Sequence, residues 1–180
     1  GADILDIGAQ STRPGADIIG EKEEIKRLLP VLIEIRKIFP KLIISIDTFN
    51  SEVAYKALKH GANWINDVTG GKNDKSILDV VAEFDCPYVI THSKGNSKTM
   101  NKLSVYNNLM EEIINSLIKL SESAMDKNVG KDKIIWDPGL GFAKNKDHNI
   151  YILKNLDRLK SFDFPLLIGA SRKRFIGEIL

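Results

Sequence analysis

The sequence predicts an α/β fold, a (β/α)8 TIM barrel of parallel strands, present as an incomplete segment of about six strand–helix units. Three observations predict it. Short runs of aliphatic residues alternate with longer segments of helical periodicity. Several strands are continuous Val/Ile/Leu runs, as expected when parallel strands are covered on both faces. Polar residues or glycine follow each strand, so six strand ends would place functional groups at one rim.

The expected elements follow one another without a low-complexity linker. The first strand covers residues 2–7, and a loop joins it to a helix over 21–39. Four further strand–helix pairs are expected at 42–46 and 50–59, 62–65 and 74–84, 87–90 and 104–128, and 134–136 and 148–159. A sixth strand at 165–168 precedes a helix that begins near Arg172. We therefore expect residues 1–180 to form one domain. A complete barrel takes about 250 residues, so we expect truncation at both ends.

An open, doubly wound sheet is the alternative, because it also alternates strands with helices. Its ligands lie at a switch point that only some strand ends serve, and its first strand usually leads into a Gly-x-Gly-x-x-Gly turn. No such turn follows residue 7. The sequence favours the barrel.

Composition excludes several classes of function. Lys and Arg number 26 against 24 Asp and Glu, a net charge of +2, which is too balanced to predict a nucleic-acid partner. No apolar run approaches the roughly 18 residues that span a bilayer, so we expect no membrane insertion. Cys86 is the only cysteine, which rules out an intramolecular disulfide and a cysteine zinc site. A cytoplasmic protein is expected, with an organelle as the alternative.

Polar side chains at the predicted rim suit one kind of ligand. Asp47, Asn66 and Asp137 close three strands, and Lys173 follows the last one. A carboxylate accepts two adjacent donors in a bidentate pair, which suits a flat heterocycle with an N–H beside an amino group, such as a pterin or guanine. The alternative is that the aspartates cap helices or hold turns, and that Lys173 belongs to a solvated basic run.

Two further features have competing interpretations. The segment Ser11-Thr12-Arg13-Pro14-Gly15 lies on a loop that continues to about Gly20, and it either brings hydroxyls and an arginine over the rim or forms an ordinary Pro-Gly turn. His92 at a strand end is more typical of a packing or tautomer-fixed residue than of a base. No nucleophile and no histidine metal cluster are evident.

Taken together, the motifs resemble dihydropteroate synthase, and the resemblance covers essentially the whole chain. The matching segments are residues 2–8, 11–16, 45–48, 61–68, 137–144 and 171–173. The resemblance implies a transferase of folate biosynthesis and a sulfonamide target. Its reaction would condense 7,8-dihydropterin-6-ylmethyl diphosphate with 4-aminobenzoate to give dihydropteroate and diphosphate.

The resemblance also implies residue roles. The expected pterin-binding residues are Asp47, Asn66, Asp137, Phe142 and Lys173. The expected aminobenzoate-binding residues are Thr12, Arg13, Pro14 and Arg174, the last of which stands where many synthases have a serine. Magnesium would assist loss of diphosphate. Its asparagine ligand and an Arg-x-His element for diphosphate are expected outside these residues, so we assign no metal ligand and expect the segment alone to be inactive.

The sequence departs from the family at two places. Ala9-Gln10 replaces the common Gly-Glu, and Ser93-Lys94 stands where a methionine commonly packs on the pterin. Two alternatives remain open: a methyltetrahydrofolate-binding methyltransferase domain, and a non-catalytic pterin-binding fragment of a multifunctional protein. A homodimer and fusion to another folate-pathway domain are also left open.

Overall fold

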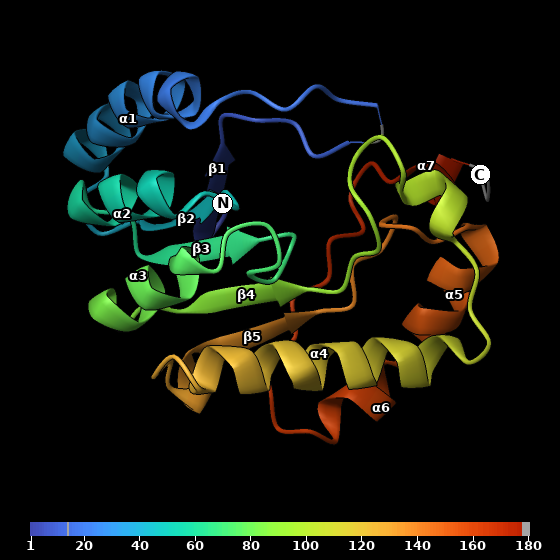
Figure 1. Cartoon of the computed structure of the whole chain (residues 1–180). Helices are drawn as coiled ribbons and strands as arrows, with labels where there is room; N and C mark the ends of the chain where they lie inside the picture. The colour runs from blue at the N-terminus through green and yellow to red at the C-terminus, as the bar shows by residue number, and fades with distance from the viewer. Residues whose placement is uncertain (14, 178–180) are drawn as a thin grey trace.

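One parallel sheet with helices along its outside forms the framework of the chain (Figure 1). The computed structural model describes residues 1–13 and 15–177. The strands pair in chain order, every pair parallel: β1 (Ile4–Gly8), β2 (Ile43–Asp47), β3 (Trp64–Asp67), β4 (Tyr88–Thr91) and β5 (Ile134–Asp137). Because this order never reverses, the described sheet has no switch point of the doubly wound kind. The prediction of a barrel segment is confirmed.

The helices follow the strands as predicted, with differences at two places. The longer ones are α1 (Glu21–Ile38), α2 (Ser51–Lys59), α3 (Ser76–Phe84), α4 (Leu109–Met125) and α5 (Lys146–Lys154), and the short ones are α6 (Leu156–Lys160) and α7 (Arg174–Gly177). A 3₁₀ turn at Met100–Leu103 precedes α4, which therefore begins later than predicted, and another lies at Lys131–Lys133. The helix expected over 148–159 is divided at Asn155, whose backbone is not helical.

The sixth expected strand is reduced to a single bridge. Residues 165–168 lie beside β5, where Leu166 forms an isolated parallel bridge with Trp136. Trp136 donates its backbone N–H to Pro165 at 2.9 Å, and Leu167 donates to Trp136 at the same distance. No strand pairs with the other edge of this segment among the described residues. The segment occupies the place of a sixth strand without extending the ladder.

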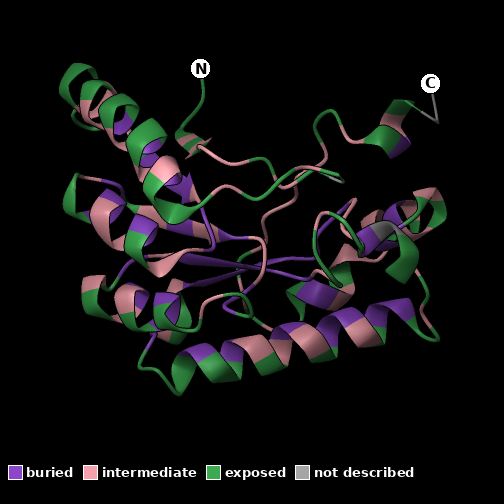
Figure 2. Cartoon of the chain, turned by 45° about the horizontal axis from the view of Figure 1, so that its top comes forward, coloured by how far each residue is buried: buried purple, intermediate pink, exposed green. Residues whose placement is uncertain are grey.

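The strand register sorts side chains onto two faces of the sheet. Ile44 and Ile46 share a face with Ile65, and all three are fully buried in the main apolar cluster together with helix residues such as Leu32 and Val53. Figure 2 shows the same division, with buried residues concentrated on the strands and on the sheet-facing sides of the helices. The core therefore lies between the sheet and its helices.

Polar groups buried in this helix-facing layer are paired. Asp67 is fully buried and accepts hydrogen bonds from the Tyr88 hydroxyl, from both the N–H and hydroxyl of Thr69, and from the Gly71 N–H, each at 2.7 Å. The indole of Trp136 donates to Ser121 on α4 at 2.8 Å. These bonds satisfy groups that would otherwise destabilise the core.

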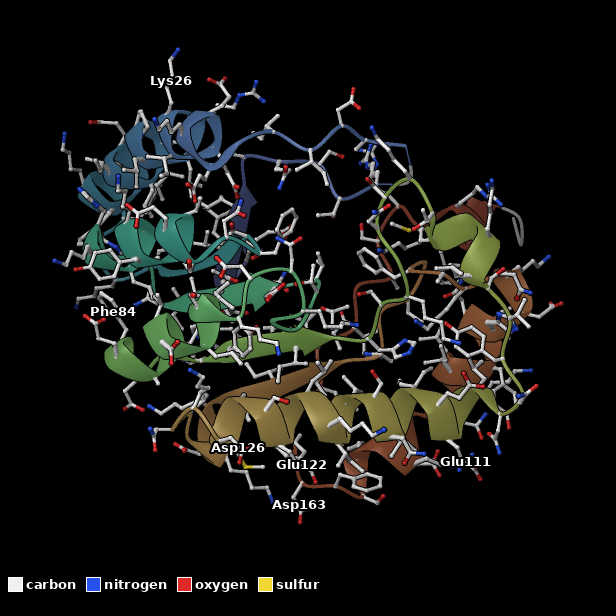
Figure 3. All side chains as sticks on the ribbon, viewed as in Figure 1. Lys26, Phe84, Glu111, Glu122, Asp126 and Asp163 are labelled. Atoms are coloured by element: carbon white, nitrogen blue, oxygen red, sulfur yellow. The ribbon has the colours of Figure 1, made fainter. Side chains whose placement is uncertain are left out.

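Helix α4 shows how the outer surface is built. Its buried residues include Ile113 and Leu117, whereas Glu111 and Glu122 are exposed on the side turned away from the sheet (Figure 3). The side chain of Asn108 caps its first turn by accepting from the Glu111 N–H. None of the described helices is long and apolar enough to cross a membrane.

Candidate active site at the rim of the sheet

The predicted rim residues lie on the face of the sheet opposite the helices. Asp47 is in register with Asn66, and Asn66 is in register with Val89, which pairs in turn with Ile135 two residues before Asp137. Because side chains alternate along a strand, Asp47, Asn66 and Asp137 share one face. Parallel pairing also brings their strand ends to the same rim. The structure thus brings together the three strand-end residues that the sequence selected.

Asp47 is a carboxylate without a structural partner. Its Oδ1 atom is buried and has no hydrogen bond among the described residues. Burial, together with the neighbouring charges of Asp6 and Asp67, raises the pKa of Asp47 to about 7, and the charge of Lys173 opposes this shift. Asn50, not Asp47, is the N-cap residue of α2. The interpretation of Asp47 as a helix cap is therefore wrong, and its free oxygen is suited to accept from a ligand.

A glutamate from α1 holds the loop that follows Asp47. Glu24 is fully buried, and its two oxygens accept from the Thr48 hydroxyl at 2.7 Å and the Asn50 amide at 2.5 Å. Both donors lie directly after β2. This contact ties α1 to the end of β2 and fixes the backbone from which Asp47 projects.

Asn66 is bonded to a carboxylate that the sequence analysis did not select. Its amide Nδ2 donates to Asp6 Oδ2 at 3.0 Å. Asp6 lies two residues before the end of β1, in register with Ser45, and therefore on the same face as Asp47. Strand alternation in the sequence was the signal that could have identified Asp6.

Asp137 is buried and holds its own turn. It is 7% exposed, and its Oδ1 accepts from the Gly139 N–H at 2.7 Å. Burial raises the pKa of Asp137 to about 6, whereas this N–H and the charges of Lys144 and Lys173 lower it. The alternative interpretation of Asp137 as a turn residue is correct for this oxygen atom.

Lys173 interacts electrostatically with both Asp47 and Asp137. Its charge lowers the pKa of both Asp47 and Asp137, while its own pKa is lowered chiefly by burial. Its Nζ atom lies 4.6 Å from the ring centroid of Phe142. Lys173 is half-buried, so it is not part of a solvated basic run, although Arg172 and Arg174 on either side are exposed.

Two cavities adjoin Phe142 and Thr12, which line both. The larger, of about 720 Å³, is also lined by Arg13, Lys173 and Arg174. The smaller, of about 280 Å³, is bounded by the residue 10–12 loop and by the loops after β3 and β4. Neither is lined by Asp47, Asn66 or Asp137. The predicted residues thus form two clusters. The sheet cluster consists of Asp47, Asn66 and Asp137, and the loop cluster consists of the cavity-lining residues Thr12, Arg13, Phe142, Lys173 and Arg174. Pro14 lies outside the described residues.

Lys144 and His92 form a buried pair beside Asp137. Lys144 is 8% exposed, His92 is 2% exposed, and the lysine Nζ lies 2.8 Å from His92 Nδ1. The expectation that His92 is a tautomer-fixed packing residue agrees with this contact. The sequence alone assigned no role to Lys144. Across residues 1–13 and 15–177, no three His, Cys, Asp or Glu side chains cluster closely enough to hold a metal ion.

Comparison with known proteins agrees with this geometry. The family model described as "Pterin binding enzyme" matches residues 1–180. The chain belongs to this family. Among curated pterin binding enzymes, it is 42% identical over 180 residues to the dihydropteroate synthase of Clostridium beijerinckii, covering 100% of this chain and 64% of the relative. It is 44% identical to a folate synthesis bifunctional protein of Arabidopsis thaliana, covering 99% and 40%.

Solved structures of pterin binding enzymes have the same fold. A Yersinia pestis dihydropteroate synthase in complex with a sulfonamide drug has a TM-score of 0.95 at 35% identity, covering 99% of this chain and 64% of that chain. The dihydropteroate synthase of Xanthomonas albilineans with 4-aminobenzoic acid has a TM-score of 0.92 at 37% identity, covering 99% of this chain and 63% of that chain. The dihydropteroate synthase of Anaplasma phagocytophilum with 6-hydroxymethylpterin-monophosphate has a TM-score of 0.95 at 37% identity, covering 99% of this chain and 72% of that chain. The present chain spans less than two thirds of the length of the first curated relatives it matches.

Proposed function

We propose that the protein carrying this chain is a dihydropteroate synthase, a transferase that joins 7,8-dihydropterin-6-ylmethyl diphosphate to 4-aminobenzoate. The observation that carries the proposal is the convergence of two buried carboxyl groups, Asp47 and Asp137, with Asn66 on one face of the sheet. The printed names of the relatives support it over a methyltransferase, since they are dihydropteroate synthases or folate synthesis proteins.

The sheet cluster of Asp47, Asn66 and Asp137 would bind the pterin. The free oxygen of Asp47 and the carboxylate of Asp137 would accept ring N–H and amino donors, and the Asn66 amide would meet an edge that has both a donor and an acceptor. Lys173 would donate to a ring carbonyl or nitrogen from its place over Phe142. Each assignment follows from the donor and acceptor capacity of the side chain.

Residues of the loop cluster would bind the second substrate, 4-aminobenzoate. Thr12 and Arg13 would form one wall of the 4-aminobenzoate site, and Arg174 would face the carboxylate of that substrate. Pro14 is assigned to the same site from the family resemblance alone. Phe142 lines the cavity and contacts Lys173, so it would separate the two substrates' sites while keeping them adjacent.

The reaction then needs little covalent chemistry from the protein. The arylamine nitrogen bonds to the methylene carbon, the bond from that carbon to the diphosphate oxygen breaks, and the arylamine loses one proton. Positive charge develops on the pterin as diphosphate leaves, and the carboxylates of Asp47 and Asp137 would stabilise it. Magnesium would assist the departure of diphosphate, and its ligands would lie outside residues 1–13 and 15–177, where no three His, Cys, Asp or Glu side chains cluster closely enough to hold a metal ion.

The partners and compartment follow the same proposal. The substrates are small molecules, and neither a nucleic acid nor a membrane is expected. A homodimer and fusion to a second folate-pathway domain are proposed as the assemblies to test, the latter because several relatives are named folate synthesis bifunctional proteins. The buried thiol of Cys86, with no second cysteine in the chain, supports a reducing compartment such as the cytoplasm. Relatives from Pisum sativum and Arabidopsis thaliana are named as mitochondrial, which keeps an organelle as the alternative.

The decisive experiment uses the full-length gene product with both substrates and magnesium, and measures formation of dihydropteroate. Asp137→Asn converts one acceptor into a donor and should weaken pterin binding about 30-fold, equivalent to about 2 kcal/mol, through a mispaired buried group. Asp126→Asn, at an exposed position after α4, is the matched control.

Three results would overturn parts of the proposal. Pterin binding without turnover would indicate a non-catalytic pterin-binding protein. Methyl transfer from methyltetrahydrofolate without dihydropteroate formation would indicate the methyltransferase. A folded Asp137→Asn variant with unchanged pterin affinity would restrict Asp137 to its role in the turn.

A further inference from the structure

Lys144 is a buried ammonium group with neutral hydrogen-bond acceptors on all sides. Its Nζ atom lies 2.8 Å from His92 Nδ1 and donates to the backbone oxygens of His92, Gly139 and Phe142 at 3.2, 3.0 and 3.0 Å. An ammonium group has three N–H donors, so the four acceptors use all of them. No carboxylate lies within ion-pair distance of Lys144 among the described residues.

A lysine is rarely buried in this way without a function, because removing its charge from water is unfavourable. The contacts of Lys144 join two loops that are distant in sequence. His92 follows β4, whereas Gly139 and Phe142 lie on the loop after β5. The two loops also touch directly, since a Cβ atom placed on Gly139 would lie 2.1 Å from the His92 carbonyl oxygen. Lys144 therefore fixes the loop that begins directly after Asp137 and carries Phe142.

The contact also fixes the protonation of His92. Because an ammonium group can only donate, Nδ1 must accept and the imidazole must be neutral. Burial and the charge of Lys144 agree with this, since both hold the pKa of His92 far below its usual value. His92 is thus a fixed acceptor rather than a base.

Several charges act on Lys144 and Asp137. Lys144 is faced by Asp137, by Lys72 and Lys94 from neighbouring loops, and by Lys173, and its charge also reaches His148 on α5. Burial lowers the pKa of Lys144 to about 7, while Asp137 opposes that shift. Asp137 is faced by the Gly139 N–H, Lys144 and Lys173. Of the two lysines that lower the pKa of Asp137, Lys144 has the larger effect.

We propose that Lys144 is a positioning residue for pterin binding: it fastens the Asp137–Phe142 loop to His92 and supplies positive charge that keeps the Asp137 carboxylate ionised. This inference rests on the proposed function, in which that carboxylate accepts two donors from the pterin. Lys144 acts through Asp137 and Phe142 and does not itself contact the substrate.

The test measures pterin binding as a function of pH with the full-length gene product and 6-hydroxymethylpterin as the probe. Binding requires ionised Asp137 and, in the proposed function, ionised Asp47. Wild-type affinity should therefore decline in two steps as the pH falls, through about 7 for Asp47 and through about 6 for Asp137. In Lys144→Met the lost positive charge should move the Asp137 step upward by about one pH unit. The ionised fraction of Asp137, and with it the affinity, should then fall about twofold at pH 7 and about tenfold at pH 5. Lys144→Arg restores a charge and should return the Asp137 step toward its wild-type pH, even where the larger side chain weakens binding.

Two further variants complete the design. Lys119→Met removes an exposed lysine from α4 and should leave the pH profile unchanged. If Lys144→Met does not fold, Lys144→Gln carries the same prediction, because its amide can donate to the same backbone oxygens without a charge.

The outcomes separate this inference from the proposed function. A wild-type protein that binds no pterin at any pH contradicts the proposed function itself. A wild-type protein that binds pterin, together with a folded, uncharged Lys144 variant whose affinity declines at the wild-type pH, overturns the role of Lys144 and leaves the proposed function standing.

Discussion

The side-chain amide of Asn66 donates to the carboxylate of Asp6 across the intervening strand β2, at 3.0 Å. An ionised carboxylate only accepts, so this bond determines which end of the amide faces β1. The remaining N–H and the Oδ1 atom of Asn66 are then left as one donor and one acceptor. That pair matches the mixed edge of a pterin, and Asp6 determines its orientation.

Replacing Asp6 should therefore weaken pterin binding without removing any direct ligand contact. In Asp6→Ala the Asn66 amide can rotate, and we expect a loss of about 1 kcal/mol, or about fivefold in the dissociation constant for 6-hydroxymethylpterin. Calorimetry measures this directly. Asp3→Ala removes an exposed acid from the residues just before β1 and should have no effect. Equal affinity in the two variants would show that Asn66 is held by other contacts.

Asp47 should reduce the stability of the protein at neutral pH. Its folded-state pKa is raised to about 7 from an unfolded value of about 3.9. The folded state therefore holds this proton while the unfolded state releases it, and stability falls as the pH rises from about 4 to about 7. Above pH 7 the whole penalty, on the order of 2–4 kcal/mol, is present.

Removing this carboxylate should separate stability from function. Asp47→Asn should raise the free energy of unfolding relative to wild type at pH 8 and change it little at pH 4, while it weakens pterin binding. Denaturant unfolding at the two pH values checks the first effect, and calorimetry checks the second. A stability difference that is the same at both pH values would mean that Asp47 does not titrate as described.

Local sequence patterns were sufficient to predict most of the sheet. Strands β2 to β5 lie within two residues of their predicted ranges, because runs such as the one before Asp47 are buried on both faces and permit no other element. The segment at 165–168 has the same composition, yet a strand also needs neighbours, and it pairs only with Trp136. Pairing depends on the rest of the sheet, which local composition does not describe.

The sequence identified candidate residues that parallel strand ends bring together, and it missed those that are joined by contacts between distant loops. The sequence was sufficient to select Asp47, Asn66 and Asp137, because parallel strands bring their ends together. Lys144 was not, because its partner His92 lies 52 residues away and a buried lysine resembles an exposed one in sequence. Asp6 was overlooked because it precedes the end of its strand by two residues.

Gly139 should tolerate no side chain. Its φ angle is +69°, which favours glycine, and an added Cβ would lie 2.1 Å from the His92 carbonyl oxygen. Gly139→Ala should therefore lose about 3 kcal/mol or more of stability, combining backbone strain with a displaced loop. Gly169→Ala is the matched control, since a Cβ there meets nothing within 4 Å. Thermal unfolding of the two variants should differ by several degrees, and similar midpoints would mean that the Gly139 loop moves away from His92 at little cost.

Arg174 should select the carboxylate of 4-aminobenzoate. It is exposed at the start of α7 and lines the larger cavity together with Lys173 and Arg13, where a guanidinium group can form a charge-assisted, bidentate bond with a carboxylate. Arg174→Ala should raise the KM for 4-aminobenzoate about tenfold, with pterin affinity unchanged, and Arg158→Ala on α6 is the matched control. The loss should shrink for aniline, which has no carboxylate to lose. Kinetics in which both arylamines suffer equally would show that Arg174 supports the loop around the cavity, because a specific contact with the carboxylate must discriminate between them.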